Sequence, residues 1–511
     1  MKLGELLTVL KSKATLPSEG LDREVLDITH DSRNVRPGSL FVAVRGFHSD
    51  GHQFIPQAVQ RGAVAIVAEG SHSKAFSRET PLITVDDSRS ALALLATLFY
   101  GHPSQKLSLV GITGTNGKTT TTYLIKSIIE AAGRKAGLIG TIDYRVGNKV
   151  YPAPNTTPES LDLQHLLAEM VGLGVDFCVM EVSSHALALG RTVGCEFAVA
   201  GFTNLTQDHL DFHENMDAYF RAKLLLFAGL SPDASAVINI DDERAPEIIG
   251  ATRAKVLTTG FSERADIRPS GSIGHGIRGL SFSVTTPSGT ISLDSPLVGS
   301  HNVYNILSAI GIGTALGFDG DVIARGISAV QAVPGRMEKV DEGQSFGVVV
   351  DYAHTEDALF RLLEAVREIT AGKVITVFGC GGDRDRTKRP RMGAAAVNGS
   401  DIIILTSDNP RTEEPLNIIY EIEKGMKAAG VRTPLRELMS TAAPGKTPYC
   451  VIPDRREAVA AAINMAGRED VVVLAGKGHE DYQIIGDRKI HFDDREVARQ
   501  EIRRRQVKED R

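Results

Sequence analysis

Apolar residues along the chain gather in short runs of strand length that alternate with amphipathic stretches. In the first hundred residues LFVAVRG and AVAIVAE have the length of strands, and FIPQAVQRG between them has the pattern of a helix. This alternation predicts a small α/β domain. A helix within SRSALALLATLFYGHPSQ should end at Gly101 and Pro103, so we predict an N-terminal domain of residues 1–103.

The apolar runs become continuous from Lys106 onward. KLSLVGIT, VDFCVMEVSS, FAVAGFTNL and ASAVINIDD each end in Gly, Ser, Asn or Asp. Uninterrupted apolar strands separated by helices are typical of a parallel sheet covered on both faces. Around residues 266–298 the alternating GLSFSVTT and GTISLDSPL predict an antiparallel elaboration at the edge of that sheet. A helix should follow from about Asn302 to Leu316, and we predict a central domain of residues 104–334.

The last third of the chain places polar residues directly after apolar strands. Pro334 and Gly335 in VPGRMEKV form a hinge-like break, and FGVVVDYAH, KVITVFGCGGDRD, DIIILTSDNPR and DVVVLAGKGHED follow. Such a pattern predicts a second doubly wound α/β domain of residues 335–511, with ligands bound beyond the carboxyl ends of the strands. The whole chain therefore predicts an α/β protein of three domains.

Composition excludes some partners. The 57 basic and 63 acidic residues of the 511 are mixed along the chain and leave a formal charge of −6, so no basic surface for nucleic acid is indicated. No stretch approaches the apolar length of a membrane span, and the first residues lack the features of a secretion signal. We expect a cytoplasmic protein without a membrane span.

One segment has the pattern of a phosphate-binding loop. LSLVGITGTNGKTTTTYLIKSIIEAAG predicts a strand, a glycine loop and a helix that begins near Lys118 and Thr119. Glycines let the backbone approach phosphate oxygens, and the start of a helix presents unpaired N–H groups. Ile112 stands where the full motif has glycine, so only the shorter GTNGKT form is present. A Gly-rich turn with an incidental lysine is the alternative, and the loop by itself does not distinguish a hydrolase, kinase, switch or ligase.

Acidic and histidine residues are predicted close to this loop. Glu181 ends the apolar run DFCVMEVSSH and could hold a metal beside a nucleotide. FTNLTQDHLDFH offers Asp208, His209, Asp211 and His213, but a magnesium site rarely uses histidine, so His209 taken alone is predicted to be a hydrogen-bonded loop residue. Spacing alone predicts that Lys223, on the helix MDAYFRAKLLLFAG, is a solvated lysine on an amphipathic face.

Ten sequence blocks in order carry a resemblance to a known family. They are GTNGKTTT, MEVSSHAL, TNLTQDHLDFH, the YFRAK helix, GSHNVYN, PGRME, VDYAHTEDAL, GCGGDRDRTKRP, SDNPRTEEP and AGKGHEDYQ. Together they resemble the Mur ligases over nearly the whole chain, and among these the members that add diaminopimelate. The resemblance implies an N-terminal domain that grips the UDP end of a substrate, a central P-loop ATPase domain with a parallel sheet, and a C-terminal Rossmann-like domain that delivers an amino acid.

The resemblance also implies roles for individual residues. The residues expected to contact ATP are Gly114, Thr115, Asn116, Gly117, Lys118, Thr119, Thr120, Asn302, Arg336 and Asp351. The expected catalytic residues are Lys118, Glu181, His209 and Lys223. The expected magnesium ligands are Thr119, Glu181, His209 and Lys223, the last as a carbamate in which carbon dioxide has turned the cation into an anion. The residues expected to contact the UDP-linked substrate are Ser32, Phe47, His48, Ser49, Asn155, Thr156, Thr157, Ser183 and Arg191. Leu189 stands where well-known relatives carry glutamine, so that substrate contact should be lost or replaced.

The sequence of one loop indicates which amino acid is added. SDNPRTEEP resembles the DNPR motif of diaminopimelate-adding members, and lysine-adding relatives lack its arginine. A guanidinium offers a planar fork to a carboxylate, which diaminopimelate has where lysine has only hydrogen. The expected diaminopimelate contacts are Arg384, Asp408, Asn409, Pro410, Arg411, Gly476 and Glu480, with Glu480 suited to an ammonium group. Asp-Asn-Pro is also strong turn chemistry, so the motif could be only a turn.

The reaction implied by the resemblance is ATP-dependent amide formation in peptidoglycan synthesis. It would join meso-diaminopimelate to UDP-N-acetylmuramoyl-L-alanyl-D-glutamate through an acyl phosphate, and we expect a monomer. Another amide ligase of the same architecture, such as a folylpolyglutamate synthase or a sister Mur enzyme, is the nearest alternative. A nucleotide-dependent switch or binding protein is the alternative of another class, and it would bind ATP without forming an amide.

Overall fold

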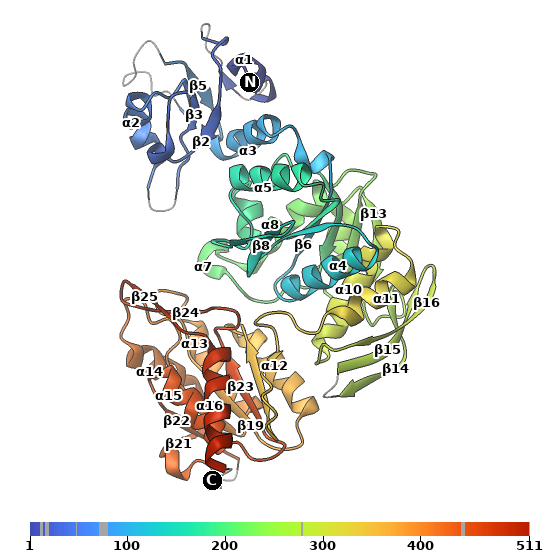
Figure 1. The fold of residues 1–511 in the computed structure, drawn as a ribbon, viewed down its shortest axis with the longest axis vertical. Coiled ribbons are helices and arrows are strands. Elements are labelled where there is room, and N and C mark those ends of the chain that lie inside the picture. Colours follow the sequence, from blue (N-terminus) through green and yellow to red (C-terminus); the bar gives the residue numbers. More distant parts are fainter. Residues whose placement is uncertain are drawn as a thin grey trace.

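The computed structural model describes residues 1–10, 14–15, 20–46, 49–70, 80–276, 279–440 and 445–509. Within these residues the chain forms three α/β bodies in a row, which Figure 1 shows from the N-terminal body at the top to the C-terminal body at the bottom. The predicted α/β class is confirmed. Among the described helices, none is long and apolar enough to cross a membrane.

The N-terminal body is built on a sheet of order β1-β5-β4-β3-β2, parallel except for β1. Alternate residues of its strands face opposite cores: Leu40 and Val42 pack with α3, whereas Phe41 and Ala43 pack with α2. Its elements are α1 (Leu3–Leu6), β1 (Ala14–Thr15), β2 (Asp27–Thr29), β3 (Ser39–Val42), α2 (Ile55–Gln60), β4 (Ala65–Glu69), β5 (Leu82–Val85) and α3 (Ser88–Phe99).

The central body has a sheet of order β13-β12-β11-β6-β10-β7-β8-β9, in which the β7–β8 and β8–β9 pairings are antiparallel, so β8 alone of these strands runs opposite to the others. The apolar residues of α4 and α10 cover one face, and those of α5 and α8 cover the other. Its sheet elements are β6 (Ser108–Thr113), α4 (Lys118–Ala131), β7 (Ala136–Ile139), β8 (Asp143–Val146), β9 (Lys149–Pro152), α5 (Ser160–Gly172), β10 (Phe177–Glu181), α6 (Ser184–Ala188), β11 (Phe197–Phe202), α7 (Leu210–His213), α8 (Met216–Ala228), β12 (Ser235–Asn239), α9 (Ala245–Ala251), β13 (Lys255–Thr259), α10 (His301–Ala315) and α11 (Gly320–Ala329).

The alternating segment before α10 forms a sheet of its own. Strands β14 (Arg268–Gly276), β15 (Gly279–Thr286) and β16 (Gly289–Ser295) pair antiparallel, as predicted, but they do not extend the edge of the central sheet. Their apolar face, which includes Phe282, Val284 and Leu293, packs in the same core as Ile323 and Ile327 of α11. The three strands are thus a separate sheet that adjoins the edge strand β13, where Ile267 pairs with Thr259.

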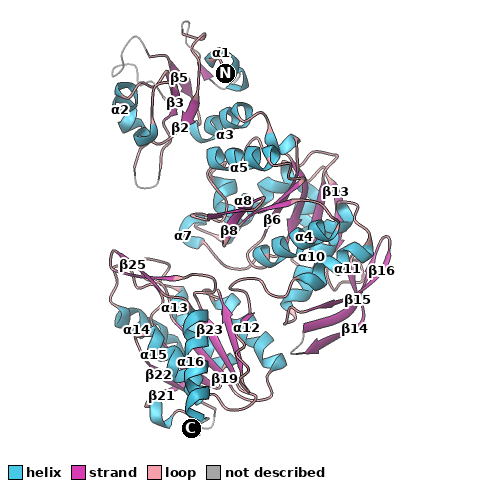
Figure 2. Cartoon of the chain, viewed as in Figure 1, coloured by secondary structure: helices cyan, strands magenta, loops and turns pink. Residues whose placement is uncertain are grey.

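The C-terminal body has a sheet of order β17-β18-β23-β19-β20-β22-β21, parallel except for β17. Helices lie on both of its faces (Figure 2): α12, α13 and α14 on one, α15 and α16 on the other. Its elements are β17 (Glu338–Lys339), β18 (Gly347–Asp351), α12 (Glu356–Ile369), β19 (Val374–Phe378), α13 (Lys388–Gly399), β20 (Ile402–Leu405), α14 (Pro415–Met426), β21 (Gly430–Arg432), β22 (Thr447–Val451), α15 (Arg455–Met465), β23 (Val471–Ala475), the hairpin β24 (Tyr482–Ile485) and β25 (Arg488–His491), and α16 (Asp494–Glu509).

Candidate active site

The glycine loop joins β6 to α4, and neighbouring groups close tightly on it. Gly114 has a φ of +146°, and a Cβ there would lie 1.9 Å from the hydroxyl of Thr203. Gly117 has a φ of +87°, and a Cβ there would lie 2.2 Å from the amide oxygen of Asn305. Glycine is required at both positions, because any side chain would clash and would adopt a strained backbone conformation.

Two lysines converge on the carbonyl of one loop residue. Lys118 Nζ donates to the Gly114 carbonyl at 3.0 Å and to that of Thr115 at 2.8 Å, and Lys223 Nζ donates to the same Gly114 carbonyl at 2.8 Å. Lys223 is 1% exposed, and its ammonium lies 4.3 Å from the ring centroid of Tyr219. The solvated lysine predicted from spacing alone was wrong, because α8 turns this face toward the loop and not toward water.

Burial lowers the pKa of both lysines. Desolvation lowers the pKa of Lys223 well below its ordinary value, and the nearby charge of Lys118 acts in the same direction. Desolvation also lowers the pKa of Lys118, although Glu181 and Asp208 oppose the effect. Lys223 is therefore held as a buried amine with a weakened tendency to carry a proton.

Glu181 lies at the carboxyl end of β10, beside Ile112 of β6. It is buried and accepts a hydrogen bond from Thr119 Oγ1 at 3.1 Å, and two more from the backbone and hydroxyl of Thr141 at 2.9 and 3.1 Å. Arg336, which follows the hinge, donates to the same Thr119 hydroxyl at 3.2 Å. A carboxylate, a hydroxyl and a guanidinium from two bodies therefore meet at the start of α4.

His209 stands in a left-handed conformation, with a φ of 55°, immediately before α7. Its Nε2 lies 3.4 Å from the carboxylate of Asp208, and its ring contacts that of His185 with centroids 4.8 Å apart. Burial lowers the pKa of His209 to about 4, so the imidazole is neutral at pH 7. Among the described residues, no group of three His, Cys, Asp or Glu side chains is arranged to hold a metal ion.

A cavity of about 260 Å³ lies between the central and C-terminal bodies, next to the glycine loop. The predicted ATP contacts that line it are Asn116, Gly117, Thr119, Thr120, Asn302, Arg336 and Asp351. Gly114, Thr115 and Lys118 are not among its lining residues. Asp351 accepts hydrogen bonds at 2.7 Å from the backbone N–H groups of Met337 and Ala353, and burial raises its pKa. His301, Tyr304 and Arg361 also line the cavity and were not predicted, although the first two belong to the GSHNVYN block.

A direct contact ties the glycine loop to the C-terminal body. Asp357, in the first turn of α12, accepts from the side-chain amide of Asn116 at 2.8 Å and from the hydroxyl of Thr206 at 3.2 Å. Arg361 on the next turn donates to the same carboxylate. Sequence reasoning missed Asp357, although it lies in the VDYAHTEDAL block.

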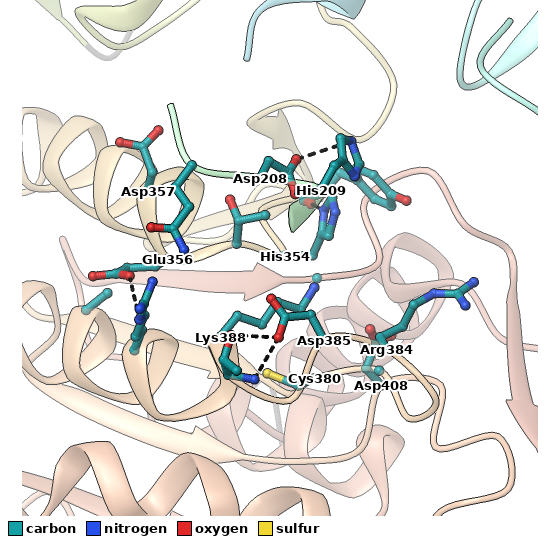
Figure 3. Close-up of a pocket in the computed structure, with 18 of the residues that line it drawn as sticks. Asp208, His209, His354, Glu356, Asp357, Cys380, Arg384, Asp385, Lys388 and Asp408 are labelled. Carbon is teal, nitrogen blue, oxygen red and sulfur yellow. Dashed lines mark hydrogen bonds and ion pairs between the residues drawn. The ribbon is translucent and has the colours of Figure 1, made fainter. Parts of the chain in front are cut away.

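A larger cavity, of about 870 Å³, opens between the same two bodies (Figure 3). Asp208 and His209 of the central body line it on one side, and Arg384 and Asp408 of the C-terminal body lie across from them. The predicted diaminopimelate contacts that line it are Arg384, Asp408, Asn409, Arg411, Gly476 and Glu480. Pro410 is not among the lining residues; its carbonyl accepts from the backbone N–H of Glu413. Except for Pro410, these predicted residues are brought together in one cavity.

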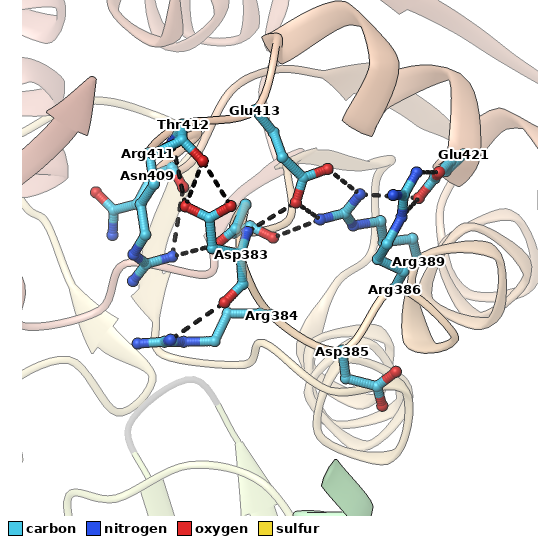
Figure 4. A network of polar contacts seen from close by, with 12 residues as sticks. Asp383, Arg384, Asp385, Arg386, Arg389, Asn409, Arg411, Thr412, Glu413 and Glu421 are labelled. Carbon is cyan, nitrogen blue, oxygen red and sulfur yellow. Dashed lines mark hydrogen bonds and ion pairs between the residues drawn. The ribbon is translucent and has the colours of Figure 1, made fainter. Parts of the chain in front are cut away.

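A network of polar contacts joins the two loops that carry Arg384 and Arg411 (Figure 4). The buried Arg389 donates to both carboxylate oxygens of Glu413 at 2.9 and 2.7 Å, to Glu421 at 2.8 Å, and to the Gly381 carbonyl at 3.1 Å. Arg384 and Arg411 extend from this network in the same direction. The Arg389 guanidinium therefore ties the two loops together and holds Arg384 and Arg411 on one side of the cavity.

This network should give the C-terminal body a defined acid sensitivity. The hydrogen bonds from Arg389 hold the pKa of Glu413 down at about 2. A lowered folded-state pKa stabilises the fold above the unfolded value of about 4.5, and this stabilisation is lost as pH falls toward about 2. Glu413→Gln should therefore flatten the fall of the urea-unfolding midpoint over this range. Exposed Glu457→Gln, in the same body, is the control; equal slopes for Glu413→Gln and the unmutated protein would contradict the assignment.

The residues expected to contact the UDP-linked substrate lie in two places. In the central body, the Thr157 hydroxyl donates to the Glu181 carbonyl at 2.8 Å, Ser183 caps α6, and Arg191 donates to the Thr157 carbonyl at 2.9 Å and pairs with Glu159 at 2.6 Å. Asn155 and Thr156 adjoin this group: the Asn155 carbonyl accepts from the Tyr144 hydroxyl, and the Thr156 and Thr141 hydroxyls lie 3.1 Å apart.

The other expected substrate residues belong to the N-terminal body. Ser32 is buried there and donates to Gln57 at 2.8 Å, and Ser49 is exposed. Phe47 and His48 lie outside the described residues. The central-body group thus adjoins Glu181, whereas Ser32 and Ser49 stand in a separate body.

A glycine loop with converging lysines faces a Rossmann-like body whose strand ends carry arginines and carboxylates, and this arrangement fits an ATP-dependent amide ligase. Three regions match family models: residues 24–100 the Mur ligase family, catalytic domain, residues 112–313 the Mur ligase middle domain, and residues 335–478 the Mur ligase, glutamate ligase domain. The chain belongs to the Mur ligase family.

Similar proteins share one name. The UDP-N-acetylmuramoyl-L-alanyl-D-glutamate--2,6-diaminopimelate ligase of Geobacillus thermodenitrificans is 48% identical over 492 residues, which cover 95% of this chain and 96% of that protein. The ligase of the same name from Solibacter usitatus is 46% identical over 505 residues, or 98% of each chain. A solved structure of a ligase with this name is 30% identical, has a TM-score of 0.69 and covers 99% of both chains.

Proposed function

We propose that this protein joins meso-2,6-diaminopimelate to the D-glutamyl γ-carboxylate of UDP-N-acetylmuramoyl-L-alanyl-D-glutamate in peptidoglycan synthesis, with ATP converted to ADP and phosphate. The observation that carries the proposal is the larger cavity, which brings Arg384, Arg411 and Glu480 into one space with His209 of the central body. The names and near-complete coverage of the similar ligases support it.

The chemistry needs a leaving group on the acid. A carboxylate does not condense usefully with an ammonium in water, so a carboxylate oxygen attacks the γ-phosphorus of ATP, ADP departs, and an acyl phosphate results. Lys118 and the backbone N–H groups of the glycine loop neutralise the phosphate charge. An uncharged amine of diaminopimelate then attacks the acyl carbon, and the tetrahedral intermediate expels phosphate while the nitrogen loses a proton. Closure of the bodies excludes water from the acyl phosphate.

The C-terminal body orients the incoming amino acid. Arg384 and Arg411 suit the carboxylate at one end of diaminopimelate, and Glu480 suits the ammonium on the same carbon. The amine at the other end is then free to face the central body across the cavity. Lysine has no carboxylate at the first end, so with lysine the two arginines would remain unpaired in the cavity.

We propose magnesium at the start of α4. The Thr119 hydroxyl and the Glu181 carboxylate lie 3.1 Å apart, and both are hard oxygen ligands of the kind magnesium prefers. Lys223 as an amine does not suit a cation, but as a carbamate it would add an anionic oxygen, and neutral His209 would adjoin them. When bound, magnesium supplies positive charge against the phosphates of ATP.

Carbamylation of Lys223 is a separate prediction. The buried amine should react with carbon dioxide, because only an unprotonated amine is nucleophilic and burial disfavours the ammonium form. With isotopically labelled bicarbonate, a carbamate carbon resonance should appear in the NMR spectrum of the unmutated protein and vanish in Lys223→Met. Lys126→Met, on α4, is the control and should retain the resonance. A resonance that persists in Lys223→Met would refute the assignment.

We also propose domain bounds of 1–103, 104–334 and 335–511, a cytoplasmic location and a monomeric state. The succession of separate sheets along the chain supports the bounds.

The deciding experiment is an acceptor assay followed by mass spectrometry. The protein is incubated with ATP, magnesium and the UDP-linked dipeptide, together with diaminopimelate, lysine or glutamate in turn. We expect ADP and a UDP-linked tripeptide with diaminopimelate alone. A product with lysine or glutamate instead would indicate a sister ligase, and ATP binding without any amide product would indicate a switch or binding protein.

A further inference from the structure

Lys477 is a completely buried cation in the wall of the diaminopimelate cavity. It follows β23 in the AGKGHED segment and is 0% exposed. Its Nζ lies 3.2 Å from Glu480 Oε2, 3.5 Å from Asp408 Oδ1 and 3.4 Å from Asn409 Oδ1. One ammonium therefore contacts three residues that line the larger cavity, while Lys477 itself is not among the lining residues.

The contacts of Lys477 also orient a neutral neighbour. The Asn409 amide oxygen accepts from Lys477 and, at 2.9 Å, from the backbone N–H of Ile484 on β24. Its amide nitrogen must then point the other way, where it donates to Glu480 Oε2 at 2.9 Å. The carboxylate of Glu480 is thus held by two donors, and Tyr482 adds a third contact at 3.4 Å.

The net charge of this cluster suits an ammonium ligand. Asp408 and Glu480 carry two negative charges when ionised, and Lys477 offsets one, so one negative charge remains for a ligand. Burial and the charge of Asp408 raise the pKa of Glu480, whereas Lys477 lowers it. Without the lysine, its charge would no longer offset that of Asp408, so the pKa of Glu480 would rise further.

We infer that Lys477 is a positioning residue that fixes the charge and geometry of the ammonium-binding side of the amino-acid cavity, so that this side accepts a single ammonium group. The inference rests on the proposed function for the identity of the ligand. Lys477 acts through Asp408, Asn409 and Glu480 and does not itself touch the amino acid.

Other charged and titratable groups surround the cluster and stay constant in the test. Arg455, fully buried with Asp494 at 2.6 Å, also reaches the carbonyl of Ala475 at the end of β23. The groups that face Glu480 or Asp408 are Tyr352, Cys380, Arg455, Lys477 and Tyr482, and Arg411 in turn acts on Tyr482.

The test uses two variants and a matched control in the full-length protein. Lys477→Met keeps the length of the side chain and removes its charge, and Lys477→Met/Asp408→Asn removes one charge of each sign. Lys489→Met is the control, since the exposed Lys489 lies over the ring of Tyr482 at 3.8 Å. The Kd of diaminopimelate is measured by calorimetry across neutral pH, with KM and kcat in parallel, and circular dichroism checks that each variant is folded.

We expect Lys477→Met to raise the Kd and KM for diaminopimelate by at least about thirtyfold near pH 7, as for a buried charge pair that loses one partner. Because Glu480 must then lose a proton before it binds the ammonium group, the Kd of this variant should also fall by up to about tenfold per pH unit as pH rises, whereas that of the unmutated protein changes little. Removing Asp408's charge as well should abolish this new pH dependence. In Lys477→Met alone, kcat at saturation should change by less than about threefold.

Three results would overturn the inference. One is a Kd and pH profile of Lys477→Met equal to those of the Lys489→Met control. Another is a raised Kd that does not depend on pH, as a packing role alone would give. A pH dependence that remains after the second substitution would also overturn it, since the charge of Asp408 would then not be its cause. The proposed function fails independently: it fails if the unmutated protein forms no diaminopimelate product, whatever the binding measurements show.

Discussion

Lys118→Ala is expected to lower kcat/KM for ATP-dependent ligation about a thousandfold, the upper part of the range for removing one preorganised charge at a reacting oxyanion. Lys118 stands at the first position of α4, where its ammonium reaches the loop carbonyls of Gly114 and Thr115 at 3.0 and 2.8 Å. In the ATP complex the same ammonium would turn to the phosphates. Its loss leaves the charge that develops during phosphoryl transfer without its nearest side-chain cation.

The measurement is acceptor-dependent ADP release, with kcat and KM for ATP determined separately. Lys126→Ala is the matched control, because Lys126 lies on the same helix and forms an ion pair with Glu130 at 2.5 Å. Lys126 lies about two turns further along α4, away from the glycine loop, so the control should ligate normally. Ligation by Lys118→Ala within about threefold of the control would disprove its role in phosphoryl transfer.

Much of the fold follows from local patterns. The continuous apolar runs predicted β6, β10, β11 and β12, and polar residues directly after them predicted where Glu181 and the glycine loop would lie. This succeeds because the carboxyl ends of parallel strands must meet at one edge of a sheet. The short strands β17 and β21 and the hairpin β24–β25 were not predicted, since a few residues carry too little periodicity to be distinguished from a loop. β22 was also missed, because Pro448 interrupts its apolar run.

The burial of Lys223 could not be predicted from spacing. A lysine on an amphipathic helix is ordinarily solvated, and only the docking of α8 against the glycine loop places this amine on the Gly114 carbonyl. The two residues are 109 positions apart in the chain. The resemblance to Mur ligases implied a role for Lys223 in the site, whereas the periodicity of its helix predicted a solvated side chain.

The contacts between the central and C-terminal bodies could not be predicted from local sequence patterns either. Asp357 meets Asn116 across 241 positions, and Arg336 meets Thr119 across 217. Neither contact has a periodic signal, because it depends on how two separately folded bodies are placed. These contacts nevertheless bring the hinge arginine and α12 to the glycine loop, which is where a nucleotide could link the movement of the C-terminal body to catalysis.

Arg411 is the residue on which the choice of amino acid should depend most. It has a φ of 51°, and its backbone N–H donates to the carbonyl of Ile484 while its carbonyl accepts from Gly486, so the hairpin β24–β25 holds it on both sides. Its guanidinium donates to the Gly382 carbonyl at 2.8 Å. A guanidinium fixed this firmly loses little freedom when it binds a carboxylate.

Arg411→Ala should therefore reduce the preference for diaminopimelate over lysine, expressed as the ratio of their kcat/KM values, about a hundredfold. This corresponds to about 3 kcal/mol for a charged hydrogen-bonding group that one substrate satisfies and the other leaves unpaired. Most of the change should come from a higher KM for diaminopimelate, because Arg411 lies away from the phosphoryl-transfer site. Arg436→Ala, a largely exposed arginine of the same body paired with Glu437, is the control and should keep the preference. If Arg411→Ala discriminated as well as the control does, its turn geometry and not its charge would explain the motif, and selection for diaminopimelate would have to lie with Arg384.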